Sequence, residues 1–166
     1  MKGIIIAGFA GVGKTTLAKK YKNVIDLESS TYRWDNSELE DIPTEERKGT
    51  VRKPNESWPE NYISAIKNSQ SKYDIVLVWI HPDVLKIYEQ NNIQYTLCYP
   101  NKDSLHIYRQ RYIDRGNNEH YVSKVTGSYD MRFEQFKALD SSGIILEGEQ
   151  TLEDYLLSNH YNLTSE

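Results

Sequence analysis

One short segment near the start of the chain constrains the fold more than any other. Residues 8–15 read Gly-Phe-Ala-Gly-Val-Gly-Lys-Thr and fit the pattern G-x-x-x-x-G-K-[ST], the Walker A pattern, at every fixed position. The apolar run at 4–7 stops at a glycine and predicts a strand buried on both faces, and residues 14–20 predict a helix. A buried strand, a glycine-rich turn and a helix in this order are typical of a parallel α/β sheet.

The residue types in this segment are those that a phosphate-binding loop needs. Glycines let backbone N–H groups turn toward phosphate oxygens, and the start of the helix adds the positive end of its dipole. Lys14 is expected to reach the β- and γ-phosphates, and the Thr15 hydroxyl to hold Mg²⁺. With ATP and Mg²⁺ as the expected cofactors, the predicted nucleotide-binding residues are Gly8, Ala10, Gly11, Val12, Gly13, Lys14, Thr15 and Thr16.

Strands and helices alternate along the rest of the chain. Further strands are predicted at 24–27, 75–80, 93–99 and 144–146, and further helices at 59–70, from 81 onward, and at 101–115, 119–139 and 151–157. The stretch 28–58 is polar and rich in helix breakers, so we expect a substrate-facing excursion there. We therefore predict a single three-layer α/β domain over 1–166, a P-loop NTPase with a five-stranded parallel sheet and helices on both faces.

Composition narrows the classes of protein and partner. The chain has 166 residues, enough for one ordinary domain, and a single cysteine, which makes no internal disulfide. A net charge of −4 makes a broad nucleic-acid-binding surface unexpected. No apolar stretch approaches the roughly 18 residues of a membrane span. We expect a cytoplasmic protein with a small-molecule substrate, no membrane and no nucleic acid, as a monomer or homodimer.

Given the complete motif, its position and the strand spacing, the chain resembles the P-loop kinases of the nucleoside monophosphate kinase type. This group includes adenylate, shikimate and gluconate kinases. The resemblance implies a phosphate-binding loop after a central first strand, a mobile acceptor-binding region after strand two, and an arginine-bearing lid late in the chain. It also implies transfer of a phosphoryl group from ATP, as a kinase does.

The segment 101–120 matches the place of that lid, and we expect a short helical hairpin there. Arg111 and Arg115 are four residues apart and share a helical face, whereas Arg109 points elsewhere. Guanidinium groups neutralise the charge of a transferring phosphoryl group, so Arg111 and Arg115 are candidate catalytic residues. The alternative is a solvated helix.

The end of the second strand matches the acceptor side. Asp26 and Glu28 lie at the end of that strand, and either carboxylate is a candidate catalytic base or substrate anchor. An arginine and two aromatic rings come next, suited to an acceptor phosphate and to stacking on a base. The alternative is an acidic strand end with a helix N-cap at Ser29 or Ser30. The candidate acceptor-binding residues are Ser29, Tyr32, Arg33, Trp34 and His81.

Three further features leave their roles open. Asp83 follows the third strand and is either a second magnesium residue beside Thr15 or a first-turn helix residue. His81 either contacts a substrate phosphate or forms a hydrogen bond within the protein. Adenylate kinases have an arginine near this point, and this chain has none there. A basic cluster of Arg47, Lys48, Arg52 and Lys53 is either a solvated loop or an acceptor-phosphate site.

Three functional hypotheses follow. The first is an ATP-dependent kinase that transfers the γ-phosphoryl group to a nucleotide, for which a (deoxy)nucleoside monophosphate best suits the nearby arginines. The second is a kinase of hydroxyl groups, on a nucleoside, sugar acid or polynucleotide 5′ end, with Asp26 or Glu28 as base. The third is a nucleotide-binding regulatory ATPase or switch. Residues 101–103 read Asn-Lys-Asp and lack the spacer of the guanine motif N-K-x-D, which disfavours a GTPase switch.

Overall fold

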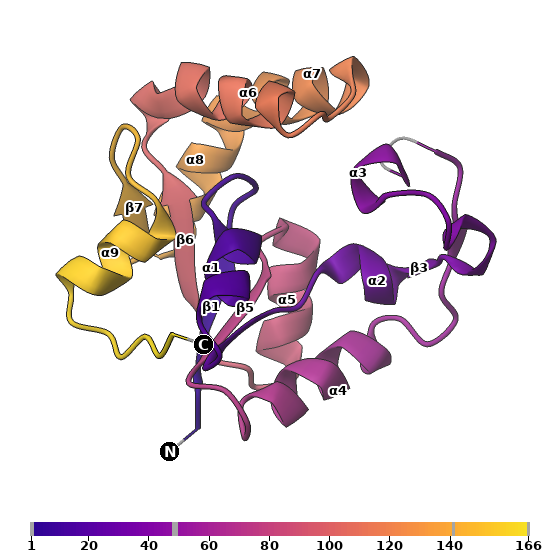
Figure 1. Cartoon of the computed structure of the whole chain (residues 1–166), viewed down its shortest axis with the longest axis horizontal. Helices are drawn as coiled ribbons and strands as arrows, with labels where there is room; N and C mark the ends of the chain where they lie inside the picture. Colours follow the sequence, from indigo (N-terminus) through magenta and orange to yellow (C-terminus); the bar gives the residue numbers. More distant parts are fainter. Residues whose placement is uncertain (1, 48–49, 141, 166) are drawn as a thin grey trace.

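Five parallel strands form the central sheet of the computed structural model, which describes residues 2–47, 50–140 and 142–165 (Figure 1). The sheet order is β2-β5-β1-β6-β7, so β1 lies in the middle. The predicted α/β fold with its motif after a central first strand is therefore confirmed. The strands are β1 (Ile4–Gly8), β2 (Val24–Asp26), β5 (Ile75–Trp79), β6 (Thr96–Pro100) and β7 (Ile144–Leu146).

Burial along β5 shows that the sheet is covered on both faces. Successive side chains of a strand point to opposite faces, and Val76, Leu77 and Val78 are each 0% exposed. The covering helices are α1 (Lys14–Lys20), α4 (Glu60–Ser69), α5 (Pro82–Gln90), α8 (Tyr129–Leu139) and α9 (Leu152–Ser158). Among them, α1 packs against β2, α4 against β5 and α8 against β6.

Two of the predicted elements differ clearly from the structure. The single helix predicted at 119–139 is two helices, α7 (Glu119–Gly127) and α8, separated at Ser128. Gly127 is a poor helix residue, and the Ser128 hydroxyl donates to the Lys124 carbonyl at 3.1 Å, so the first helix ends there. The strand predicted from 93 begins at Thr96, because Ile93 still closes the preceding turn by donating to the Tyr88 carbonyl.

The polar excursion at 28–58 contains more regular structure than its composition predicts. A two-stranded antiparallel sheet closes its base, pairing Trp34 with Pro54 and Asp35 with Lys53. Between these strands the Arg47 guanidinium donates to carbonyls of the same loop and holds it together. The elements are α2 (Ser29–Arg33), β3 (Trp34–Asp35), η1 (Ser37–Leu39), α3 (Thr44–Arg47) and β4 (Lys53–Pro54).

A helical hairpin occupies the segment predicted as a lid. After η2 (Lys102–Ser104), α6 (Leu105–Asp114) turns at Gly116, which has a φ of +78°, and α7 packs back against α6 (Figure 1). The hairpin lies on the same side of the molecule as the loop between β1 and α1. Among the described residues, no helix is long and apolar enough to cross a membrane.

Candidate active site

Lys14 is folded back along the loop between β1 and α1. Its ammonium group donates to the carbonyl of Gly8 at 2.8 Å and to that of Phe9 at 3.1 Å. A side chain at position 8 would meet this lysine, since a Cβ there would lie 3.0 Å from its Cδ. The glycine therefore makes room for Lys14 to span the loop.

Other parts of the chain hold the next three carbonyls of the loop from outside. The donors come from the helical hairpin and from the start of α9, at 2.8 to 3.0 Å. With these carbonyls turned outward, the loop is braced by segments that lie about 100 and 140 residues away in the sequence. The pairs are Tyr112 Oη with Ala10 O, Arg111 Nη1 with Gly11 O, and Leu152 N with Val12 O.

The amides of the same loop are left for a ligand. Within the described part of the chain, the N–H groups of Gly11 and of residues 13–16 donate to no protein acceptor. Gly11 and Gly13 have φ values of +88° and +100°, the left-handed region in which glycine is favoured. A ring of amide donors with one lysine is an oxyanion site, and its residue types fit the phosphates of ATP.

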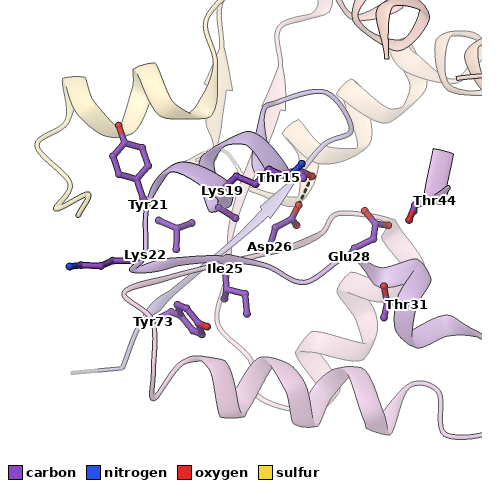
Figure 2. A pocket seen from close by; sticks show the side chains of 12 residues that line it. Thr15, Lys19, Tyr21, Lys22, Ile25, Asp26, Glu28, Thr31, Thr44 and Tyr73 are labelled. Atoms are coloured by element: carbon purple, nitrogen blue, oxygen red, sulfur yellow. Dashed lines mark hydrogen bonds between the residues drawn. The ribbon is translucent and has the colours of Figure 1, made fainter. Parts of the chain in front are cut away.

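Thr15 is paired with a carboxylate from the edge strand of the sheet. Its hydroxyl donates to Asp26 Oδ2 at 2.8 Å, while Asp26 Oδ1 is buried without a hydrogen-bond partner (Figure 2). Burial raises the pKa of the Asp26 carboxyl, and the Lys14 ammonium and the Thr15 hydrogen bond act in the opposite direction.

This pair fits Mg²⁺. Magnesium binds oxygen, is usually held by one or two carboxylates, and takes its other ligands from water and substrate phosphates. An unpartnered carboxylate oxygen beside a threonine hydroxyl supplies the protein's share of such a shell. No cluster of three or more metal-ligating side chains occurs among the described residues, so a metal held entirely by them is not built in.

An open groove of about 670 Å³ runs past this pair (Figure 2). At one end it is lined by Asp26, Glu28 and the threonines Thr31 and Thr44, and it continues along β2 to Tyr73. Both candidate base carboxylates therefore lie in one groove with Thr15. Burial lowers the pKa of Lys14, and the negative charges of Asp26 and Glu28 oppose this effect.

Glu28 also begins the next helix. Its carboxylate accepts from the backbone N–H of Ser30 at 3.4 Å, so the N-cap of α2 is Glu28, and the expected alternative of a cap at Ser29 or Ser30 is wrong. Carboxylate oxygens accept helix N–H groups as serine hydroxyls do, which is why the pattern was ambiguous. Ser29 itself is buried.

The chain's three tryptophans gather around Arg33. The guanidinium carbon of Arg33 lies 5.2 Å from the ring centre of Trp34, 5.9 Å from Trp58 and 5.4 Å from Trp79. Arg52 approaches the same Trp34 ring at 5.1 Å. These five residues, here named the tryptophan cage, come from four separate segments. Arg33 and Trp34 are among the predicted acceptor residues, and Arg52 belongs to the basic cluster for which an acceptor-phosphate site was one alternative.

The cage is a cationic site in which no carboxylate contacts either arginine in the described part of the chain. Among the described residues, neither Arg33 nor Arg52 forms an ion pair within 4 Å. Burial lowers the pKa of Arg52, the charge of Arg47 adds to this, the Glu28 carboxylate opposes it, and Arg33 adds a smaller repulsion. An anion placed here would relieve this repulsion. Of the remaining basic cluster, Lys53 pairs with Glu38, and Lys48 lies outside the described residues.

His81 lies beside the tryptophan cage, just after the end of β5. Its ring lies 4.9 Å from that of Trp79, and its Nε2 is 3.2 Å from a guanidinium nitrogen of Arg132. Its Nδ1 accepts from the backbone N–H of Asp83 and caps α5. Burial and then Arg132 lower the pKa of His81. The Asp83 carboxylate is 3.5 Å from His81, so Asp26, rather than Asp83, is the carboxylate placed against Thr15.

The two candidate lid arginines have different surroundings. Arg111 stacks over Tyr108 at 4.7 Å and donates to the Glu149 carbonyl at 2.7 Å as well as to the loop. Arg115 caps the end of α6 and is exposed, and its charge lowers the pKa values of both Lys14 and Asp26. Arg111 thus holds the loop in place. Arg115 instead acts electrostatically on Lys14 and Asp26, the residues expected beside a bound phosphoryl group. Tyr32, predicted to stack on a base, packs against Tyr62 at 5.2 Å.

Comparison with known proteins gives a similarity of fold. No family model and no curated protein matches the chain. Among solved structures, the chain is similar to a gluconokinase from Sinorhizobium meliloti 1021, with 15% sequence identity and a TM-score of 0.47. The similarity covers 92% of this chain and 86% of that one. The functional assignment therefore rests on the geometry of the site.

Proposed function

We propose that the protein is an ATP- and magnesium-dependent kinase that transfers the γ-phosphoryl group to a small anionic acceptor, a (deoxy)nucleoside monophosphate. The observation that carries the proposal is the loop at 8–16. The carbonyls of residues 10–12 are held from outside it, and the N–H groups of Gly11 and of residues 13–16 have no protein acceptor among the described residues. Such a cradle recognises a polyphosphate by charge and geometry. The Thr15 and Asp26 oxygens beside it suit the metal that accompanies ATP.

In this proposal each charged residue has a defined task. The loop amides and Lys14 bind the β- and γ-phosphates and stabilise the charge that develops on them. Mg²⁺, when bound, neutralises phosphate charge; Thr15 and Asp26 would hold it. Arg115 approaches the transferring group from the helical hairpin, and Arg111 keeps the loop in its binding shape through Gly11.

The tryptophan cage supports an acceptor that already carries negative charge. Two guanidinium groups without carboxylate partners favour a phosphate, and the indole rings offer surfaces on which a base can stack. Such an acceptor needs no strong base, because its phosphate oxygen is already ionised.

A second candidate is a kinase that acts on a hydroxyl group. It is supported by the raised pKa of Asp26 and by the presence of Glu28 in the same groove, since a hydroxyl acceptor must lose its proton to a nearby carboxylate. A regulatory ATPase, the third hypothesis, needs neither the cage nor the groove.

The test is ADP release from Mg·ATP with matched acceptor pairs, each nucleoside against its own monophosphate. The proposal requires acceptor-dependent ADP with the monophosphates, lost in Lys14→Ala and retained in Arg109→Ala, a control on the exposed side of α6. Activity with the nucleoside instead moves the assignment to the hydroxyl-directed kinase. Slow ADP release that no acceptor stimulates favours the regulatory ATPase.

A further inference from the structure

A buried tyrosine links the ends of two strands of the sheet. Tyr62, in α4, is 0% exposed, and its hydroxyl donates to the carbonyl of Leu27 at 3.0 Å. The same oxygen accepts from the backbone N–H of Trp79 at 3.1 Å. Leu27 directly follows β2, and Trp79 is the last residue of β5. One hydroxyl group therefore bridges the carboxyl ends of both strands, where ligands of a parallel sheet bind.

A second tyrosine extends this chain of hydrogen bonds. The hydroxyl of Tyr88 donates to the carbonyl of Trp79 at 3.0 Å, so tyrosines hold both backbone groups of that residue. Burial raises the pKa values of the Tyr62 and Tyr88 hydroxyls, and both therefore stay protonated near neutral pH. The network keeps one arrangement under assay conditions.

The residues joined by Tyr62 belong to different halves of the site. On one side, Leu27 lies between the two candidate carboxylates Asp26 and Glu28 in the sequence. On the other, Tyr62 contacts the tryptophan cage twice, through the backbone of Trp79 and by stacking on Trp58 at 5.4 Å with 23° between the ring planes. In the described ranges, no other side chain forms hydrogen bonds or ring contacts with both the β2 end and two cage tryptophans.

We propose that Tyr62 is a positioning residue that sets the two carboxylates at the end of β2, Asp26 and Glu28, in register with the acceptor held in the tryptophan cage. The inference rests on the proposed function, because it assigns acceptor binding to the cage. The Tyr62 ring supports the Trp58 wall, and its hydroxyl fixes the Leu27 peptide against Trp79. Loss of the hydroxyl removes this link and leaves the bond from Leu27 N–H to the Leu77 carbonyl as the remaining tie between the two strand ends. The phosphate-binding loop follows β1, across β5 from β2, and none of its residues is a hydrogen-bond partner of the Tyr62 hydroxyl.

The experiment compares three substitutions that each remove one tyrosine hydroxyl. Tyr62→Phe removes the bridge, Tyr88→Phe removes only the bond to the Trp79 carbonyl, and Tyr95→Phe removes an exposed bond to Glu89 and serves as the matched control. Each variant is assayed for acceptor kcat and KM, ATP affinity, acceptor-independent ATP hydrolysis, and Tm.

Misplacement of a reacting group by about 1 Å can lower a rate by about 10²-fold. We expect Tyr62→Phe to lower acceptor kcat by about 10- to 100-fold, with ATP affinity and basal hydrolysis within about twofold of wild type. Tyr88→Phe should chiefly raise acceptor KM, because the β2 end keeps its bond to Tyr62. A folded Tyr62→Phe with wild-type acceptor kcat overturns the inference, as does an equal loss of ATP affinity. If Tyr62→Phe does not fold, the inference requires the KM effect in Tyr88→Phe, and its absence overturns it.

A second readout separates failure of this inference from failure of the proposed function. All three tryptophans lie in the cage, so their fluorescence reports anion binding without turnover. If wild type shows no acceptor-dependent ADP release, the proposed function fails. The positioning role then requires quenching of wild-type fluorescence by inorganic phosphate, with a weaker affinity in Tyr62→Phe. An unchanged titration in Tyr62→Phe, or no response in wild type, overturns it.

Discussion

Asp26→Asn should make the protein more stable and less active at the same time. The residue is half-buried, and its Oδ1 is buried without a hydrogen-bond partner. A buried acceptor without a partner costs about 1–3 kcal/mol, and more when it is charged. Asparagine keeps the shape and the Thr15 hydrogen bond but removes the charge. Because the attraction of Lys14 is lost as well, we expect a net gain of about 1 kcal/mol in the free energy of unfolding.

The pH dependence of this gain has a definite sign. Burial raises the folded-state pKa of Asp26 above its ordinary value of 3.8. Below that ordinary value the carboxyl is protonated in both states, and the substitution gains nothing. As the pH rises toward the folded-state pKa, the unfolded state ionises first and wild type loses stability relative to the variant. The gain is therefore full at neutral pH and disappears in acid.

For a chain of this size, about 1 kcal/mol corresponds to about 2–4 °C in Tm. Thermal unfolding of wild type, Asp26→Asn and Asp83→Asn at pH 7 and pH 4 measures this, with and without Mg·ATP. The exposed Asp83 should change stability by no more than about 0.5 kcal/mol. Mg²⁺ should raise the Tm of wild type and Asp83→Asn in the presence of ATP, and that of Asp26→Asn much less. Turnover of Asp26→Asn should fall at least about 10²-fold.

Two results would refute this reasoning. A lower Tm for Asp26→Asn at pH 7 would mean that the carboxylate is a structural partner of Lys14 and Thr15. Loss of the magnesium effect in Asp83→Asn, with its retention in Asp26→Asn, would restore Asp83 as the metal residue.

Three other substitutions test separate parts of the site. Arg33→Gln should raise the KM for a nucleoside monophosphate by at least about 10-fold, since a charge-assisted hydrogen bond contributes about 1.5–3 kcal/mol, and should leave the KM for ATP unchanged. Steady-state kinetics with Arg109→Gln as the control measures both KM values. Equal effects on both substrates would contradict the cage assignment. Arg111→Ala should weaken ATP binding by about 10-fold in calorimetry, because Gly11 loses its brace; unchanged affinity would show that the loop holds its shape alone. Gly11→Ala should lower stability by about 1–2 kcal/mol through its φ of +88°, with the added methyl 3.1 Å from the Tyr108 and Tyr112 rings, and urea unfolding measures this; a neutral result would mean that the loop relaxes freely.

Local signals were strong enough to predict the framework of the fold. The run at 4–7 and the helix at 14–20 follow from burial pattern and a complete motif, and the structure has both where they were expected. The break at Ser128 was missed because the helical periodicity continues across it, and only Gly127 marks the end of α7. The small sheet at the base of the excursion was missed because two-residue strands carry no periodicity.

The site also contains residues that could be predicted from local sequence and contacts that could not. Lys14, Thr15 and the glycines were predicted because one contiguous segment determines their geometry, and Asp26 was predicted because it ends a strand beside them. The pairing of Asp26 with Thr15 could not be predicted, since the same reasoning allowed Asp83. Arg52, Trp58 and Trp79 were not predicted to be near Arg33, because no sequence spacing relates them.

By itself, the sequence determined a phosphate-binding loop in a parallel α/β sheet, because these features depend on residues that are neighbours in the chain. They are glycines that accept a positive φ, a run of residues buried on both faces of a strand, and a helix that follows directly. Only the tertiary structure decided what lies opposite that loop. The tryptophan cage, the outward bracing of the loop by Arg111 and Tyr112, and the Tyr62 bridge all join residues far apart in the chain. Such contacts depend on how helices pack across strand ends, and this follows from the folded core as a whole.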